Sequence, residues 1–145
     1  MTLILDTNIV VDIISRRDGY EDSLQIVKCC ELGMVVGFVS VITITDVMYI
    51  LRKHMAPSLV REAVQILLLI VDVANVLKSD ISSAFFSDMK DYEDAVQSSC
   101  AERLKADYIV THNIKDFKKS VIPAILPNEA LKMIMGVADS GRMGY

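Results

Sequence analysis

The sequence has few cysteines and histidines, no excess of positive charge and no apolar run long enough to cross a membrane. Its three cysteines are the adjacent pair Cys29 and Cys30 and the distant Cys100, a spacing that predicts neither a disulfide framework nor a zinc site. His54 and His112 are the only histidines, and we interpret both as structural or surface residues. Carboxylates, by contrast, are abundant, with 19 Asp and Glu residues.

The chain also lacks the features of secreted and membrane proteins. Its amino terminus has no basic segment followed by a long apolar core, so it does not resemble a secretory signal. The most apolar stretch, 66–77, is shorter than the roughly 20 residues that span a bilayer and contains Asp72 and Asn75. A formal net charge of −4 argues against an overall electrostatic grip on nucleic acid but is compatible with a local basic rim. We therefore expect a cytoplasmic protein without a membrane partner.

Short apolar runs alternate with helical patterns along the chain. The runs contain no polar alternation, which is typical of parallel strands covered on both faces. They are 3–5, 35–39, 70–73 and 108–110, and the helical patterns are 24–33, 41–54, 60–68 and 96–104. We predict an α/β fold, a three-layer α/β/α sandwich with a mostly parallel central sheet. Residues 1–137 are expected to form a single domain and residues 138–145 a loose C-terminal tail.

One carboxylate directly follows the first predicted strand, and another lies on the predicted helix after the second strand. In open parallel sheets the functional site lies beyond the carboxyl ends of the strands. Asp6 directly follows the first run, with a helix cap for the segment beginning at Asn8 as its alternative role. Asp46 has mostly apolar neighbours on its helix, so we expect a partly buried charge that must be paired or bind metal. Its alternative is a capping box in which Thr43 is the cap.

A third acidic group opens the last predicted helix. Negative charge is favoured there by the helix macrodipole, which accounts for much of the acidic stretch 87–94. Asp94 shares a helix face with Gln97, Ser98 and Ala101, small or polar side chains that would let a phosphate backbone come close. Asp91 lies one turn earlier on nearly the same face.

The loop after the last apolar run carries Asn113 and Asp116, which by themselves predict a turn and a helix cap. With Asp6, Asp46 and Asp94, they place acidic or amide groups at four points that a parallel sheet can bring to one crevice. Oxygen ligands of this kind suit hard cations such as Mg²⁺ and Mn²⁺.

Three segments carry a resemblance to a known family. They are LDTNIVVD at 5–12, SVITITDVMYILRK at 40–53 and DYEDAVQSSCAERLKADYIVTHNIKDF at 91–117. They resemble the PIN (PilT amino-terminal) domain nucleases, which include the VapC-type toxins of bacterial toxin–antitoxin pairs. The resemblance implies a metal-dependent endonuclease that usually acts on RNA, with one or two Mg²⁺ or Mn²⁺ ions. It further implies a small antitoxin protein as partner and a homodimer.

The resemblance also assigns roles to the acids. The family's catalytic and metal-binding acids fall on Asp6, Asp46 and Asp94, and on the loop at Asn113 or Asp116. The second acid is commonly Glu, so the shorter Asp46 would bind a metal ion directly or through water. The loop position that is often Asp in toxins is Asn113, and we predict that Asp116 is the ligand with Asn113 in support.

Metal-activated water is the predicted nucleophile for hydrolysis of the RNA phosphodiester bond. Thr7, Asn8 and Thr111 are predicted to orient the ligands, with Asp91 as a further supporting acid. Basic residues near these elements are predicted to contact phosphates, with solvated helix ends as the alternative. They are Arg16, Arg17, Arg52, Lys53, Lys115, Lys118 and Lys119.

Two other functions fit parts of the pattern. One is a catalytically weakened PIN-like module that binds RNA or protein, motivated by the neutral Asn113. The other is a phosphatase or phosphotransferase with Asp6 as nucleophile, although Asn8 stands where such a site would place its second acid.

Overall fold

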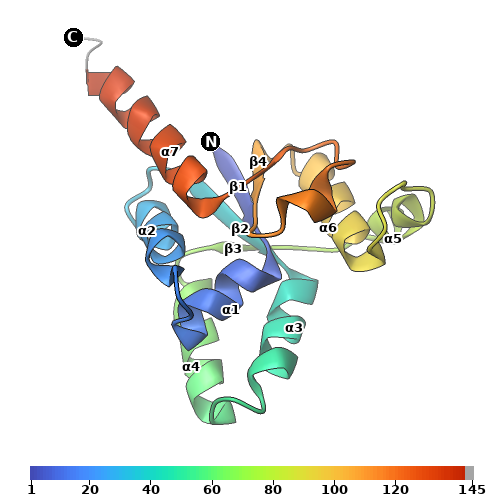
Figure 1. Ribbon diagram of the computed structural model, residues 1–145, viewed down its shortest axis with the longest axis horizontal. Helices are drawn as coiled ribbons and strands as arrows, with labels where there is room; N and C mark the ends of the chain where they lie inside the picture. Colours follow the sequence, from blue (N-terminus) through green and yellow to red (C-terminus); the bar gives the residue numbers. More distant parts are fainter. Residues whose placement is uncertain (143–145) are drawn as a thin grey trace.

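A five-stranded parallel sheet forms the centre of the protein in the computed structural model, which describes residues 1–142 (Figure 1). The strands lie in the order β3-β2-β1-β4-β5, and every neighbouring pair is parallel. Their bounds are Thr2–Leu5 (β1), Val36–Ser40 (β2), Asp72–Ala74 (β3), Tyr108–Val110 (β4) and Ala124–Ile125 (β5). The predicted parallel sheet is confirmed.

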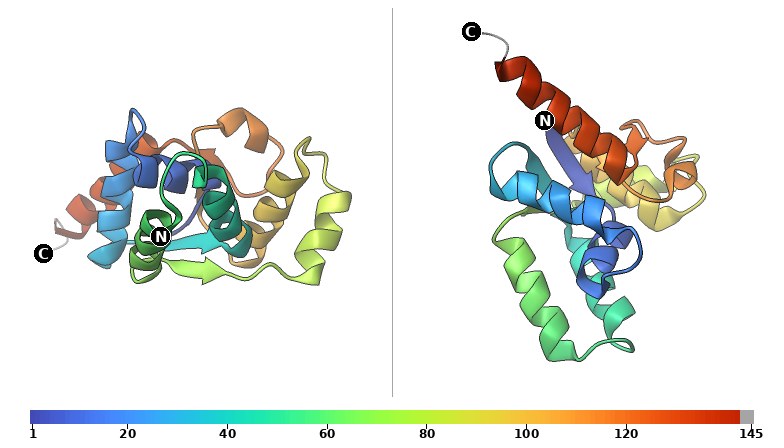
Figure 2. Two further views of the ribbon diagram at one scale, coloured as in Figure 1. Left: turned by 90° about the horizontal axis from the view of Figure 1, so that it is seen from below. Right: turned by 60° about the vertical axis from the view of Figure 1, so that its left-hand side comes forward.

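Helices cover both faces of the sheet, which confirms the three-layer sandwich (Figures 1 and 2). Their bounds are Thr7–Ser15 (α1), Tyr20–Glu31 (α2), Val41–Leu51 (α3), Pro57–Leu68 (α4), Lys78–Phe85 (α5), Tyr92–Arg103 (α6), Ile114–Phe117 (the 3-10 helix η1) and Pro127–Arg142 (α7). The main core joins Leu3 and Leu5 to α1, α2, α3, α4 and α7, whereas Ile4 packs with Ala101 of α6 and Phe117 of η1. Since adjacent side chains of β1 enter opposite layers, all three are fully buried.

The third strand begins later than its apolar run predicts. Ile70 and Val71 close the end of α4, because their backbone N–H groups both donate to the carbonyl of Leu67, at 2.9 and 3.0 Å. The strand itself starts at Asp72 and lies at the edge of the sheet. Its partly exposed Val73 is consistent with an edge position.

Two helices have no counterpart in the sequence prediction. Helix α5 is held on α6 by the ion pair between Asp80, which is buried, and Arg103, at 3.0 Å. Helix α7 starts at Pro127, a favoured first residue, and packs beside α2 (Figure 1). Residues 138–142, where the sequence predicts the start of a loose tail, continue α7, and residues 143–145 lie outside the described residues. Within the described residues, no helix is both long and apolar enough to cross a membrane.

Close packing between β2 and α2 depends on a glycine. A Cβ atom at Gly37 would lie 2.7 Å from Sγ of Cys30 and 3.3 Å from Cγ1 of Val71. Cys30 is free and buried, as expected from the sequence, and burial raises the pKa of its thiol to about 11. The neutral thiol thus fills the space that a side chain at Gly37 would need.

We expect Gly37→Ala to lower the free energy of unfolding by about 1–3 kcal/mol, because overpacking forces buried side chains to move. Combining it with Cys30→Ala should recover part of that loss, since the clashing sulfur is gone. Urea denaturation of the two single variants and the double variant measures the coupling. Gly136→Ala, where a Cβ atom has open space, is the control and should not be destabilising. Equal losses for Gly37→Ala with and without Cys30 would contradict this account.

Candidate active site

The carboxyl ends of β1 and β4 bring two distant segments together. Leu5 pairs with Val110 in the parallel register, so Asp6 and Thr111 follow neighbouring strands at the same edge. The backbone N–H of Asp6 donates to the carbonyl of Val110 at 3.0 Å, which carries the pairing one residue beyond the strands. The side chains of both residues consequently enter the same space.

The Asp6 carboxylate accepts four hydrogen bonds. Oδ1 accepts from the backbone N–H of Thr7 at 2.8 Å and from Gln97 Nε2 at 3.2 Å. Oδ2 accepts from Asn8 Nδ2 at 2.9 Å and from Thr111 Oγ1 at 2.7 Å. The residue is only 6% exposed, and burial raises its pKa while these four donors act to lower it. Asp6 also caps α1, so its alternative role and its position in the site coexist.

The supporting residues predicted around Asp6 form one network. Asn8 Nδ2 also donates to Thr111 Oγ1 at 3.3 Å, and Asn8 Oδ1 accepts from the backbone N–H of His112 at 3.3 Å. The Thr7 hydroxyl lies 3.0 Å from that of Thr43 on α3. Strand β4, α1 and α3 are therefore tied to the carboxylate by short polar contacts.

Helix α6 brings further acids to this edge. Asp91 caps the helix, and its Oδ1 accepts from the backbone N–H of Asp94 at 2.9 Å. Burial, and then the charges of Asp6, Asp91 and Asp116, raise the pKa of Asp94 to about 7. Four carboxylates from three parts of the chain thus repel one another here.

One feature predicted for α6 is wrong. Gln97, Ser98 and Ala101 are buried, so they form no open surface for a phosphate backbone. Gln97 instead donates to Asp6, and the Ser98 hydroxyl lies 2.6 Å from that of Ser120. This buried face anchors α6 against the end of β1 and the segment after η1.

Asp46 on α3 is linked to the acids of α6 by a hydrogen bond with Glu93. The sequence did not single out Glu93. The alternative role of Asp46, a capping box with Thr43 as cap, is not what the structure has, because Ser40 caps α3 and accepts from the backbone N–H of Thr43 at 3.1 Å. A hydrogen bond with Asp46 is the largest cause that raises the pKa of Glu93 to about 8, followed by burial and neighbouring acids. Glu93 adjoins Asp94 in an acidic run, and only the contact with α3 distinguishes it.

A pocket of about 330 Å³ opens where these groups meet. It is lined by Asp6, Thr7, Asn8, Val11, Arg17, Ile50, Asp91, Glu93, Asp94, Asn113 and Asp116, and we call it the acidic pocket. Asp46 is not among the lining residues. Asn113, which directly precedes η1, and Asp116 within η1 both line it, and the backbone N–H of Asp116 donates to the carbonyl of Asn113 at 3.0 Å.

The predicted phosphate contacts are only partly near this pocket. Arg16 lines an apolar pocket between α1, α2 and α4, whereas its neighbour Arg17 lines the acidic pocket. Arg52 stacks 3.6 Å from the centre of the Tyr49 ring, and neither Arg52 nor Lys53 lines the acidic pocket. Lys115 lines a second pocket that adjoins it. The prediction for Arg16 is therefore not supported by its position.

The acidic pocket carries more negative charge than its surroundings neutralise. Across the side chains that the structure describes, the ion pairs are Arg17 with Asp12 and Arg103 with Asp80, and His112 Nε2 lies 2.9 Å from Oδ2 of Asp12. None of them includes an acid of the pocket. As the side chains stand, the described residues contain no group of three or more His, Cys, Asp or Glu arranged to hold a metal ion. The donors are nevertheless the hard oxygens that Mg²⁺ and Mn²⁺ prefer, so their chemistry fits such an ion.

Solved structures with the same fold include two toxin–antitoxin complexes and a toxin. VapBC2 from Rickettsia felis, bound to a DNA fragment from its promoter, has a TM-score of 0.67 at 20% identity over 87% of this chain and 98% of that one. A toxin–antitoxin complex from Klebsiella pneumoniae has a TM-score of 0.65 at 20% identity, over 86% and 97% of the two chains. Mycobacterium tuberculosis VapC20, described as a sarcin–ricin loop cleaving toxin, has a TM-score of 0.59 at 13% identity, over 74% and 86%.

Family membership follows from the sequence itself rather than from these distant structures. No functionally curated protein matches the chain. The family described as PIN domain matches residues 2–115, which span every strand of the sheet except β5 and every segment of the acidic pocket through Asn113. The protein therefore belongs to the PIN-domain family, the nuclease family that its acidic segments resemble.

Proposed function

We propose that the protein is a divalent-metal-dependent endoribonuclease that uses Mg²⁺ or Mn²⁺, and that it is the toxin of a toxin–antitoxin pair. The observation that carries the proposal is the uncompensated charge of the acidic pocket, where the pKa of Asp94 is raised to about 7 by burial and by three other carboxylates. Such a cluster is costly unless a cation offsets it, and a pocket open to solvent admits one.

In this proposal some residues bind the metal ion and others orient the residues that bind it. Asp6, Asp94 and Asp116 hold the ion, and Asp46 acts through water or through its hydrogen bond with Glu93. Thr111, Asn8 and Gln97 fix the orientation of Asp6, as second contacts do for ligands in metal sites. When bound, the ion would lower the pKa of its water and offset negative charge that develops on the phosphate.

Substrate and partner are proposed from the relatives. VapC20 is described as cleaving the sarcin–ricin loop, which supports RNA as the substrate class, and the Rickettsia and Klebsiella structures support a small antitoxin partner. Homodimerisation and a cytoplasmic location remain part of the proposal. Asp91 caps α6 and borders the pocket, so we assign it a supporting role.

One alternative is kept because of a specific observation. Asn113 lines the pocket with an exposed neutral amide, which lowers the charge available to a metal ion. A PIN-like module with weakened catalysis would bind RNA or a protein without cutting. A nucleophilic role for Asp6 is disfavoured, since both of its oxygens accept hydrogen bonds and the side chain is nearly buried.

Cleavage of a structured RNA tests the function. We expect cleavage with Mn²⁺ or Mg²⁺, none in excess chelator, and at least about a 100-fold loss in rate for Asp94→Asn, because the ion loses a charged ligand. Asp72→Asn, an exposed acid on β3 away from the pocket, is the matched control and should keep the wild-type rate. RNA binding without cleavage under all conditions would instead favour the binding module.

The raised pKa values predict a particular pH dependence of stability. The carboxyl groups of Asp94 and Glu93 bind a proton more tightly in the folded protein, because their pKa values are raised from 3.8 to about 7 and from 4.5 to about 8. The folded protein therefore binds more protons than the unfolded chain in this range, and its stability falls as pH rises from about 4 to about 8. Thermal unfolding of metal-free protein should show a falling Tm, and Asp94→Asn should flatten the decrease.

A divalent ion should oppose this loss. It requires deprotonated ligands, so Mn²⁺ should raise Tm more at pH 8 than at pH 5, and its binding should release protons. Calorimetry in buffers with different ionisation enthalpies measures the proton release. A rise in Tm with Mn²⁺ that is independent of pH would contradict the assignment of Asp94 as a ligand.

A further inference from the structure

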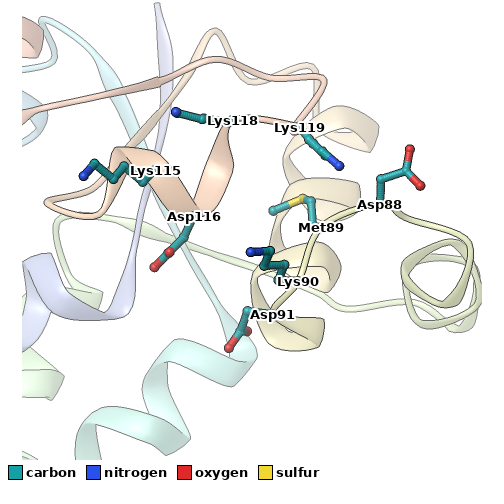
Figure 3. A pocket seen from close by; sticks show the side chains of 8 residues that line it. All are labelled: Asp88, Met89, Lys90, Asp91, Lys115, Asp116, Lys118 and Lys119. Atoms are coloured by element: carbon teal, nitrogen blue, oxygen red, sulfur yellow. The ribbon is translucent and has the colours of Figure 1, made fainter.

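A second pocket adjoins the acidic one, and its lining combines four lysines with the three carboxylates of Asp88, Asp91 and Asp116. It has a volume of about 430 Å³ and shares Asp91 and Asp116 with the acidic pocket (Figure 3). Four lysines line it, and we call it the lysine pocket; they are Lys90, Lys115, Lys118 and Lys119. Figure 3 shows Lys90 between Met89 and Asp91 on the segment before α6, with the other three lysines on and just after η1.

The lysine charges have no internal partner. Within the part of the chain whose side chains are described, no ion pair joins any of the four ammonium groups to a carboxylate. Three carboxylates line the same pocket, Asp88, Asp91 and Asp116, and of these Asp91 accepts the backbone N–H of Asp94. All four lysines are exposed, so their charges are available to an anion.

The backbone that carries the lysines is anchored. Phe117 is 2% exposed and packs with Ile4 and Ile109 of the sheet, between Lys115 and Lys118 in sequence. Ser120 lies 2.6 Å from Ser98 of α6 through their hydroxyl oxygens and follows Lys119 directly. On the other side, Met89 packs on the same apolar cluster immediately before Lys90. Both lysine-bearing backbone segments are therefore held against one core, so the lysines leave the surface from two anchored segments on either side of the pocket.

We propose that the lysine pocket binds a backbone phosphate of single-stranded RNA next to the phosphate that lies at the acidic pocket. This inference rests on the proposed function. A strand of phosphates is repelled by the carboxylates around Asp94, and a neighbouring cluster of ammonium groups offsets that repulsion and fixes the register of the strand. Because Asp91 and Asp116 form the shared wall, adjacent phosphates of one strand can occupy both pockets.

Salt-dependent binding tests the proposal without requiring cleavage. The double variant Lys118→Gln/Lys119→Gln is compared with wild type for binding of a short single-stranded RNA in chelator. Loss of two phosphate contacts reduces the log–log salt slope by about 1.4, so between 50 and 200 mM salt the wild-type Kd should rise about sevenfold more than that of the variant. Lys78→Gln/Lys132→Gln, with exposed lysines on α5 and α7, is the matched control and should keep more of the wild-type slope.

A second experiment tests which phosphate of the RNA strand occupies the lysine pocket. RNAs that each carry one neutral methylphosphonate linkage should lose affinity for wild type at one linkage, and the double variant should not distinguish that RNA from the others. A 5′-phosphate and a 5′-hydroxyl RNA should bind equally, whereas a requirement for the terminal phosphate would overturn the assignment to the backbone.

Two further outcomes would overturn the proposal. One is an equal salt slope for the double variant and wild type. The other is poly-L-glutamate binding as tightly as RNA with the same loss in the double variant, which would assign the pocket to an acidic protein segment. If no RNA is cleaved but the slope changes as expected, only the nuclease proposal fails. If cleavage is metal-dependent and the slope is unchanged, only the lysine pocket fails.

Discussion

The four hydrogen bonds to Asp6 hold the site together. A carboxylate that is only 6% exposed would favour its neutral form, but donors from α1, from α6 and from the residue after β4 all point at its two oxygens. The same contacts join the ends of the neighbouring strands β1 and β4 to α6, which packs on the face of the sheet opposite to α1. Loss of any one donor would leave a buried acceptor less satisfied, so the local fold and the charge of Asp6 depend on each other.

The other acids are placed around this fixed point and repel one another. Asp94 stands in the first turn of α6, where the helix macrodipole favours negative charge, yet burial and nearby carboxylates still raise its pKa to about 7. Glu93 points toward α3 and shares a hydrogen bond with Asp46. The raised pKa values of Asp94 and Glu93 mean that the metal-free fold favours the protonated forms of both acids more than the unfolded chain does.

The surface around the acids divides by charge over a short distance. Carboxylates meet near the carboxyl ends of β1 and β4, and four lysines, together with Asp88, line a neighbouring pocket that shares Asp91 and Asp116 (Figure 3). A net charge of −4 conceals this separation, because the total says nothing about where the charges lie. The carboxylates of the acidic pocket repel a polyanion, whereas the ammonium groups of the lysine pocket attract one.

The sequence alone determined the layered fold and the acids at the strand ends, because buried parallel strands leave uninterrupted apolar runs and the residue after such a run, such as Asp6, must emerge at the sheet edge. Local patterns could not reveal Glu93, Gln97 or α5, whose roles depend on contacts with Asp46, Asp6 and Arg103 that are distant in sequence. They also could not separate Arg16 from Arg17, since the left-handed backbone at Arg16 ends α1 and sends adjacent side chains to different pockets. Tertiary structure decided these points because burial and charge pairing depend on distances in space, which spacing along the chain does not specify.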